Sequence, residues 1–314
     1  MQTQPIPLIN LAPFLSGSSS DKQAVTNAVG RACEAIGFFS ITGHGVPSAV
    51  TDRIYTSARQ FFDLPAELRL QLKLLPNGAG YSPVQGETLA ASLGQTAPAD
   101  LKESLNIGAD WAQNLWPERP AELQPAARAY FDAVAELAAT LMRVFALALD
   151  LPGGYFTDKI DRHRSFLRII NYPDQTAEPL PGQLRAGAHT DYGTLTILRT
   201  EDAPGGLQVR NRAGEWVDIH AAPEAFVVNI GDLMQYWTND RWVSTLHRVV
   251  NPQRDQRLGS RRQSIVFFHN PNPDARVSPL ESCIGPGNPA RYPPITAGDH
   301  LALKTGKAYQ AAMD

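Results

Sequence analysis

Two histidines and one aspartate in this chain have the types and the spacing of ligands for a single metal ion. His189 and Asp191 stand two positions apart, and His247 follows much later. Side chains two apart on an extended strand point to the same face, so His189 and Asp191 should converge while Thr190 points away. His247 lies in the β-branched run 243–250, which predicts a strand that folding can bring beside the first pair. The three residues therefore predict a metal site built from two separated segments.

The chemistry of these ligands favours iron. Two imidazole nitrogens and one carboxylate oxygen on one side of a metal leave coordination positions open, an arrangement typical of non-haem Fe(II) oxygenases. None of the three is a thiolate, which argues against a closed structural zinc site. Taken singly, His-x-Asp is a common chance triplet and His247 could be an ordinary core histidine. We expect a metal centre because these residues occur together and are followed by a second polar pair.

That second pair is Arg262 and Ser264. Being two apart, they share a strand face, on which Val266 and Phe268 follow. A guanidinium group beside a hydroxyl can hold a carboxylate through charge-assisted hydrogen bonds. An arginine that points into a barrel needs an anion, either a protein acid or a ligand carboxylate, and the segment 264–268 has no acid of its own. We therefore expect the anion to be a ligand.

Short motifs occur in a fixed order over nearly the whole chain. They are Ile6-Pro7-Leu8-Ile9-Asn10-Leu11, Gly37-Phe38-Phe39-Ser40-Ile41, Gly43-His44-Gly45-Val46-Pro47, Gly80-Tyr81-Ser82-Pro83, Asp100-Leu101-Lys102-Glu103, His189-Thr190-Asp191-Tyr192-Gly193, Gly205-Gly206-Leu207-Gln208-Val209, Asn229-Ile230-Gly231-Asp232, Leu246-His247-Arg248-Val249 and Arg262-Gln263-Ser264. With these motifs the chain resembles the isopenicillin N synthase-like family of Fe(II)- and 2-oxoglutarate-dependent dioxygenases.

The resemblance implies roles for both groups of residues. It makes Fe(II) the metal and 2-oxoglutarate and O2 the cosubstrates, and it makes the metal ligands His189, Asp191 and His247. It assigns the distal carboxylate of 2-oxoglutarate to Arg262, Ser264 and Tyr172. The chain departs from plant members at one position, because Ile170 stands where they have an asparagine, two residues before the tyrosine.

The strand that contains Tyr172 also predicts part of a substrate pocket. Alternation places Arg168, Ile170 and Tyr172 on one face. Arg168 is then either a cation that faces the substrate or a member of a salt bridge at the barrel rim. Together with Tyr81 and Phe268, these side chains predict a pocket for a small or medium organic molecule with an acidic or polar group.

The reaction follows from the resemblance. It implies oxidation, with hydroxylation as the expected outcome, of a C–H bond in a small organic substrate, while 2-oxoglutarate is converted to succinate and CO2. Two alternatives stay open. Relatives of the isopenicillin N synthase and aminocyclopropane carboxylate oxidase types use Fe(II) without 2-oxoglutarate and place the Arg-x-Ser pair on another anion. A non-catalytic jelly-roll protein that binds a carboxylate ligand is the second alternative.

Composition argues against several other classes of protein. The 314 residues carry a net charge of −3 with acids and bases mixed along the chain, so nothing indicates a nucleic-acid or membrane partner. The expected partner is a small molecule, and no obligate protein partner is evident. Cys33 and Cys283 form no metal motif and fit a reducing compartment. Without a secretory leader or a long apolar run, the expected location is the cytoplasm.

The elements that must position these residues divide into three regions of one unit, 1–314. Region 1–160 predicts strands near 7–10 and 37–42, helices near 21–36 and 48–62, and a long helix from about Pro125 to Gly153. Region 161–275 predicts short strands, including a hairpin at 206–219, and region 276–314 is a C-terminal extension. The expected fold is mainly β with flanking helices: a double-stranded β-helix, or jelly-roll, core with an N-terminal α/β extension.

The stretch from Pro76 to Gly108 is rich in glycine. It is either a mobile cover over the mouth of the barrel or an ordinary connecting loop.

Overall fold

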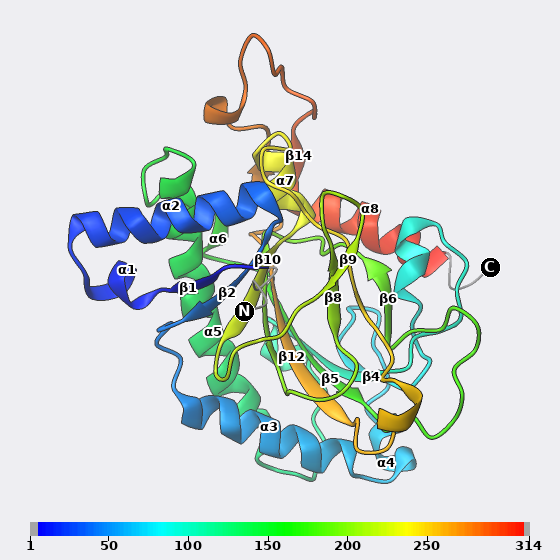
Figure 1. The fold of residues 1–314 in the computed structure, drawn as a ribbon. Coiled ribbons are helices and arrows are strands. Elements are labelled where there is room, and N and C mark those ends of the chain that lie inside the picture. Colours follow the sequence, from blue (N-terminus) through cyan, green and yellow to red (C-terminus); the bar gives the residue numbers. More distant parts are fainter. Residues whose placement is uncertain (1–5, 311–314) are drawn as a thin grey trace.

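The computed structural model describes residues 6–310, in which two β-sheets enclose a common interior (Figure 1). The strands of these sheets are β1 (Leu8–Asn10), β2 (Phe38–Thr42), β3 (Gly80–Ser82), β4 (Glu103–Gly108), β5 (Phe166–Tyr172), β6 (Ala186–His189), β7 (Leu195–Thr200), β8 (Leu207–Arg210), β9 (Trp216–Asp218), β10 (Phe226–Ile230), β11 (His247–Val249) and β12 (Arg262–His269). The major sheet has the order β1-β2-β10-β7-β12-β5-β4-β3, and the minor sheet has the order β6-β11-β8-β9. The predicted jelly roll is confirmed.

Helices cover the outer face of the major sheet. The longer ones are α2 (Ser19–Ala35), α3 (Ser48–Phe62) and α5 (Leu123–Ala148), and the shorter ones are α1 (Ala12–Ser16), α4 (Ala66–Leu70), α6 (Thr157–Ile160) and α7 (Asp232–Trp237). Helix α5 packs against β7 and β12 and against α2 and α3 (Figure 1). Its buried side chains, such as Val134, Leu137 and Leu141, recur at helical spacing and form the main hydrophobic core with the sheet.

The C-terminal extension completes the fold. It contains the two-stranded sheet of β13 (Arg276–Val277) and β14 (Ile295–Thr296), followed by α8 (Ala297–Gln310). Helix α8 contacts the short 3-10 helix η1 (Leu89–Leu93), and Lys304 forms an ion pair with Asp232 at 2.6 Å. Within residues 6–310, no helix combines the length and the apolar character needed to cross a bilayer.

The central strands of the major sheet have two chemically different faces. On β12, Ile265 and Phe267 are fully buried in the core beneath the helices, and Phe267 packs against Phe131 of α5 with ring centroids 5.1 Å apart. Ser264 and Val266 alternate with them and point into the space between the sheets. The same strand therefore builds the core with one face and the barrel interior with the other.

The structure corrects two boundaries expected from the sequence. The strand predicted at 243–250 is limited to His247–Val249, because the preceding residues bond to helical segments instead of a neighbouring strand. The backbone N–H of Val243 donates to Cys33, and the Thr245 hydroxyl donates to Ile36. The stretch 76–108 also differs from a simple loop, because it supplies β3 and β4 to the major sheet.

We predict that Phe267→Ala lowers the free energy of unfolding by about 3–5 kcal/mol, since it removes a fully buried ring from the core. Phe268→Ala is the matched control, because the Phe268 ring is only partly buried and lies on the inner face. Urea denaturation of both variants provides the measurement. Equal losses would contradict the assignment of the two faces.

Candidate active site

His189 and His247 are directly paired across the neighbouring strands β6 and β11 of the minor sheet. Their ring centroids are 4.3 Å apart. Oδ1 of Asp191 lies 3.8 Å from Nε2 of His189 and 3.6 Å from Nε2 of His247. All three ligand atoms are within 4.8 Å of one another, so they can hold one metal ion. The structure thus brings together the three residues that the sequence singled out.

Each histidine is oriented by a carbonyl of its own chain segment. Nδ1 of His189 is 2.8 Å from the carbonyl oxygen of Gly187, and Nδ1 of His247 is 3.0 Å from that of Thr245. Because a carbonyl only accepts hydrogen bonds, Nδ1 carries a proton, and in the neutral ring Nε2 then keeps its lone pair. Both rings therefore present to Asp191 the nitrogen that can bind a metal.

Asp191 is held by the opposite sheet. Its Oδ2 accepts hydrogen bonds from the hydroxyl of Thr196 on β7 at 2.5 Å and from the side-chain amide of Asn229 on β10 at 2.7 Å. These bonds leave Oδ1 facing the histidines. The carboxylate therefore closes the metal site from the major sheet, while the imidazoles come from the minor sheet.

The electrostatic environment favours the metal-binding forms of these groups. Burial and the neighbouring His247 lower the pKa of His189 to about 4, so its ring is neutral near pH 7. Burial alone would raise the pKa of Asp191, but the two histidines and the hydrogen bonds from Asn229 and Thr196 hold it below its ordinary value. A neutral imidazole and a charged carboxylate are the forms that coordinate a cation.

The local backbone differs from the expectation for His189 to Asp191. Strand β6 ends at His189, so Asp191 lies in the connection to β7 and not on an extended strand. The Thr190 hydroxyl donates to Asp232 at 3.3 Å, and the backbone N–H of Asp232 donates to the carbonyl of Asp191 at 2.8 Å. His189 and Asp191 converge as expected, but they do so because the start of α7 fixes this turn, and the strand expected to continue through Asp191 ends at His189.

Tyr172, Arg262 and Ser264 lie together on the inner face of the major sheet. Arg262 is paired with Tyr172 across β12 and β5, and the Cζ atom of Arg262 is 5.1 Å from the centroid of the Tyr172 ring. The Ser264 hydroxyl is 2.8 Å from that of Thr200. All three predicted residues are buried.

Arg262 lacks an acidic partner among residues 6–310. It is 4% exposed, its Nη1 donates to the carbonyl of Gly205 at 3.2 Å, and its Nε has no hydrogen-bond partner. A buried guanidinium group with unused donors is unfavourable unless an anion meets it. Its surroundings therefore fit a ligand carboxylate, as the sequence predicted.

Comparisons with known proteins agree with this geometry. Residues 164–271 match the model of the 2OG-Fe(II) oxygenase superfamily, and residues 6–126 match the model described as non-haem dioxygenase in morphine synthesis N-terminal. The chain is 34% identical to the 2-oxoglutarate-Fe(II) type oxidoreductase hxnY of Emericella nidulans, with 98% of this chain and 91% of that protein covered. The chain belongs to the 2-oxoglutarate-Fe(II) oxygenase superfamily. The family resemblance seen in the motifs is thus confirmed.

Two further relatives match this oxygenase over almost its whole length. Homoarginine-6-hydroxylase of Oryza sativa subsp. japonica is 33% identical, with 95% of this chain and 96% of that protein covered. The crystal structure of full-length Neurospora crassa thymine 7-hydroxylase with alpha-KG, that is 2-oxoglutarate, superposes with a TM-score of 0.87. It is 30% identical, and 96% of each chain is covered.

The oxygenase has a network of charges on the inner face beside the metal cluster. Nη1 of Arg168 lies 3.2 Å from both carboxylate oxygens of Glu87, and its Nε donates to Asn106 at 3.0 Å. Lys102 also donates to Glu87 and lies 3.5 Å from Asp100. Of the two alternatives for Arg168, the structure contains the salt bridge. Ile170 and Phe268 line the same interior, in an apolar cluster with Val266.

Tyr81 was expected in the pocket wall, and the structure corrects this. Tyr81 pairs with Leu105 of β4, whose side chain is buried in the core under the helices. The Tyr81 ring packs against Phe61 of α3, with centroids 5.9 Å apart, and its hydroxyl donates to Glu103. Strand β3 has three residues, too few for the alternation of side chains to reveal its buried face.

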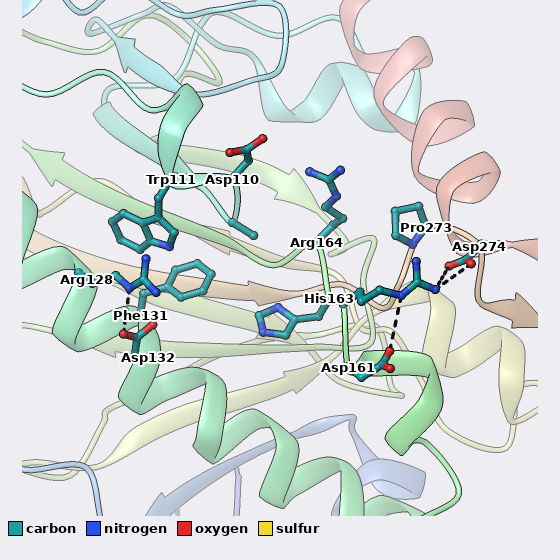
Figure 2. Close-up of a pocket in the computed structure, with 12 residues that line it drawn as sticks. Asp110, Trp111, Arg128, Phe131, Asp132, Asp161, His163, Arg164, Pro273 and Asp274 are labelled. Carbon is teal, nitrogen blue, oxygen red and sulfur yellow. Dashed lines mark hydrogen bonds and ion pairs between the residues drawn. The ribbon is translucent and has the colours of Figure 1, made fainter.

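A surface pocket of about 770 Å³ lies elsewhere, between α5 and the segments 109–111, 161–164 and 273–274 (Figure 2). Its walls include Trp111 and Phe131, and Phe131 packs on the outer face of the major sheet. Its arginines at 128 and 162 are paired with acids. None of the metal-site or carboxylate-site residues lines it, so it is separate from the candidate active site.

Sequence reasoning assigned no role to Thr196, Asn229 or Glu87. Asn229 stood in a motif, and an amide within the otherwise apolar strand Phe226–Ile230 was a usable signal. Thr196 and Glu87 had no comparable pattern, since their partners come from other segments.

We predict that Asp191→Ala weakens Fe(II) binding by more than about 100-fold, because even changes behind the ligands typically cost about 10–100-fold. Anaerobic titration of the purified protein with Fe(II) measures the effect. Asp218→Ala is the control, since Asp218 is exposed on β9 of the minor sheet. Wild-type iron affinity in the Asp191 variant would refute its role as a ligand.

Proposed function

We propose that this oxygenase hydroxylates a C–H bond of a small polar molecule, with His189, Asp191 and His247 as the ligands of Fe(II). Arg262, Ser264 and Tyr172 bind the distal carboxylate of 2-oxoglutarate. One observation carries this proposal: the same interior contains a cluster able to hold a cation and a buried arginine that has no acidic partner in the described part of the chain. These two features match the metal and the dicarboxylate cosubstrate that the family requires.

The side chains of the site have two roles: some supply charge, and others exclude water. Bound iron and 2-oxoglutarate supply the oxidising chemistry, which releases succinate and CO2. Asp191 contributes negative charge to the metal site, and Arg262 offsets the charge of the distal carboxylate. Ile170, Val266 and Phe268 surround the reacting region with apolar groups, which strengthens these electrostatic interactions.

The comparisons support the role of 2-oxoglutarate over the two alternatives. The Emericella nidulans relative is named a 2-oxoglutarate-Fe(II) type oxidoreductase, and the Neurospora crassa structure contains alpha-KG. A 2-oxoglutarate-independent oxidase would need another anion for Arg262. A binding protein without catalysis would not require the oriented histidines and the carboxylate of Asp191 on the same interior.

The charge network indicates which substrates this interior accepts. Arg168 and Lys102 are balanced by Glu87 and Asp100, so the region beside the metal ligands has little net positive charge. Burial would raise the pKa of Glu87, but the charges of Arg168 and Lys102 hold it well below its ordinary value. The carboxylate therefore stays charged and can accept hydrogen bonds from a ligand.

We infer that the substrate carries N–H groups that can donate to Glu87. One relative is named for homoarginine, and a Neurospora crassa structure contains thymine, both of which have N–H groups. Of the acidic or polar group expected from the sequence, the pairing of Arg168 with Glu87 favours the polar one. The absence of nucleic-acid, membrane and obligate protein partners and the cytoplasmic location stay predictions from the sequence.

We predict that Arg262→Ala raises the KM for 2-oxoglutarate by about 10–100-fold, since a buried charged hydrogen bond is lost. Oxygen uptake and succinate formation, measured over a range of 2-oxoglutarate concentrations, test this. Arg261→Ala is the neighbouring control, because Arg261 pairs with Asp63 instead of facing the interior. Oxygen uptake by the wild type that is indifferent to 2-oxoglutarate would overturn the proposed function.

We predict that Glu87→Gln lowers turnover of N–H-bearing substrates by about tenfold, since a charged acceptor becomes neutral. Succinate formation stimulated by basic amino acids and nucleobases, compared with aromatic carboxylic acids, provides the measurement. The KM for 2-oxoglutarate serves as the internal control and should stay within about threefold. Stimulation of the wild type by the aromatic carboxylic acids alone would refute this substrate class.

A further inference from the structure

Arg185 is a buried cation outside the residues assigned above. It is 1% exposed and directly precedes β6, the strand that carries His189. No ion pair within residues 6–310 includes it, so its charge is not balanced by a contacting acid. A buried arginine is retained at such a cost only where its hydrogen bonds are well satisfied.

Within residues 6–310, the Arg185 side chain forms hydrogen bonds to three loop segments. Nη1 donates to the carbonyl of Pro204 at 2.9 Å, and Nη2 lies 3.2 Å from the carbonyl of Pro173. Nη2 also lies 2.9 Å from the carbonyl and 2.8 Å from the hydroxyl of Ser260. One guanidinium group thus ties together segments that are distant in sequence.

Each of these segments adjoins a part of the proposed carboxylate site. Pro173 directly follows Tyr172, and Ser260 stands two residues before Arg262. Pro204 precedes Gly205, whose carbonyl accepts the hydrogen bond from Arg262. Arg185 therefore holds the backbone beside Tyr172, beside Arg262 and beside Gly205, whose carbonyl is the hydrogen-bond acceptor of Arg262.

The charge of Arg185 also acts on the same site. Its Cζ atom is 5.8 Å from the Tyr172 ring centroid, compared with 5.1 Å for that of Arg262. Burial and the neighbouring Arg262 lower the pKa of Arg185 to about 10, so the Arg185 guanidinium group stays charged near pH 7. Two buried cations beside one ring favour an anion between the sheets.

We propose that Arg185 is a positioning residue for 2-oxoglutarate, which cross-links the loops around Tyr172 and Arg262 and adds a second positive charge to the carboxylate site. This inference rests on the proposed function, because it requires Arg262 to bind the distal carboxylate. Arg185 does so without touching the cosubstrate. Lysine cannot replace it fully, because one ammonium group lacks the planar fork that reaches three carbonyls.

The test is anaerobic calorimetric titration of the Fe(II)-loaded protein with 2-oxoglutarate. We expect Arg185→Gln to raise the Kd about tenfold or more, and Arg185→Lys to raise it less. Fe(II) affinity should change by less than about threefold. In steady-state assays, KM for 2-oxoglutarate should rise while kcat at saturating 2-oxoglutarate stays within about threefold. Thermal stabilisation of the metal-free protein by glutarate, a dicarboxylate without the keto group, should weaken in parallel.

The matched control for general destabilisation is Asn272→Ala. Asn272 is also 1% exposed and links separate segments, since its side chain donates to Asp158 and Asp161 and accepts from the backbone of Arg162. That variant should lose stability while keeping the wild-type Kd for 2-oxoglutarate.

Three results would overturn the inference. One is a wild-type Kd in Arg185→Gln, or in Arg185→Lys if the glutamine variant does not fold. The second is an equal rise of the Kd in the Arg185 and Asn272 variants, which would mean that lost stability alone is responsible. The third is an unchanged Kd in Arg262→Ala, which would refute the proposed function and the inference together, whereas failure confined to Arg185 leaves the proposed function standing.

Discussion

The alternation of side chains along four central strands is the constraint on which this structure depends. On β5, β7, β10 and β12, one face is buried against the helices and the other faces the barrel interior. A shift of register by one residue would turn Arg262 toward the apolar helices and Phe267 toward the metal site. The burial of the outer face therefore also fixes the direction of the polar side chains on the inner face.

Charges inside the barrel fall into two groups according to how they are balanced. Glu87 and Asp100 together neutralise Lys102 and Arg168, and this network needs no ligand to compensate it. Within residues 6–310, Asp191 has neutral hydrogen-bond partners and histidines beside it, and Arg262 has no acidic partner. Since unbalanced buried charge is unfavourable, the second group indicates what the interior must bind: a cation at Asp191 and an anion at Arg262.

Sequence patterns predicted the parts of the site that depend on alternation or on ordered motifs. Arg262, Ser264 and Tyr172 came from strands long enough for their faces to be assigned, and the helices 48–62 and 123–148 closely match the expected ones. Tyr81 was misplaced because its short strand pairs with β4, which the sequence did not reveal. Arg185 and Thr196 could not be predicted, because their partners come from loops or strands that only the tertiary fold brings near.

The division of the site between strands and loops explains how one barrel can serve different substrates. The groups proposed to hold iron and 2-oxoglutarate belong to strands or are tethered directly to them, so their positions follow from the sheets. Glu87 lies instead in the connection between β3 and β4, which can change in length and composition without disturbing the sheet register. The homoarginine-6-hydroxylase and thymine 7-hydroxylase relatives, which are named for different substrates, are only 33% and 30% identical to this chain. Differences in substrate among relatives are therefore expected to arise from differences in the sequence of this connection. In contrast, a loop that contacts Arg185 can vary only if its carbonyl stays within hydrogen-bond distance of the guanidinium group.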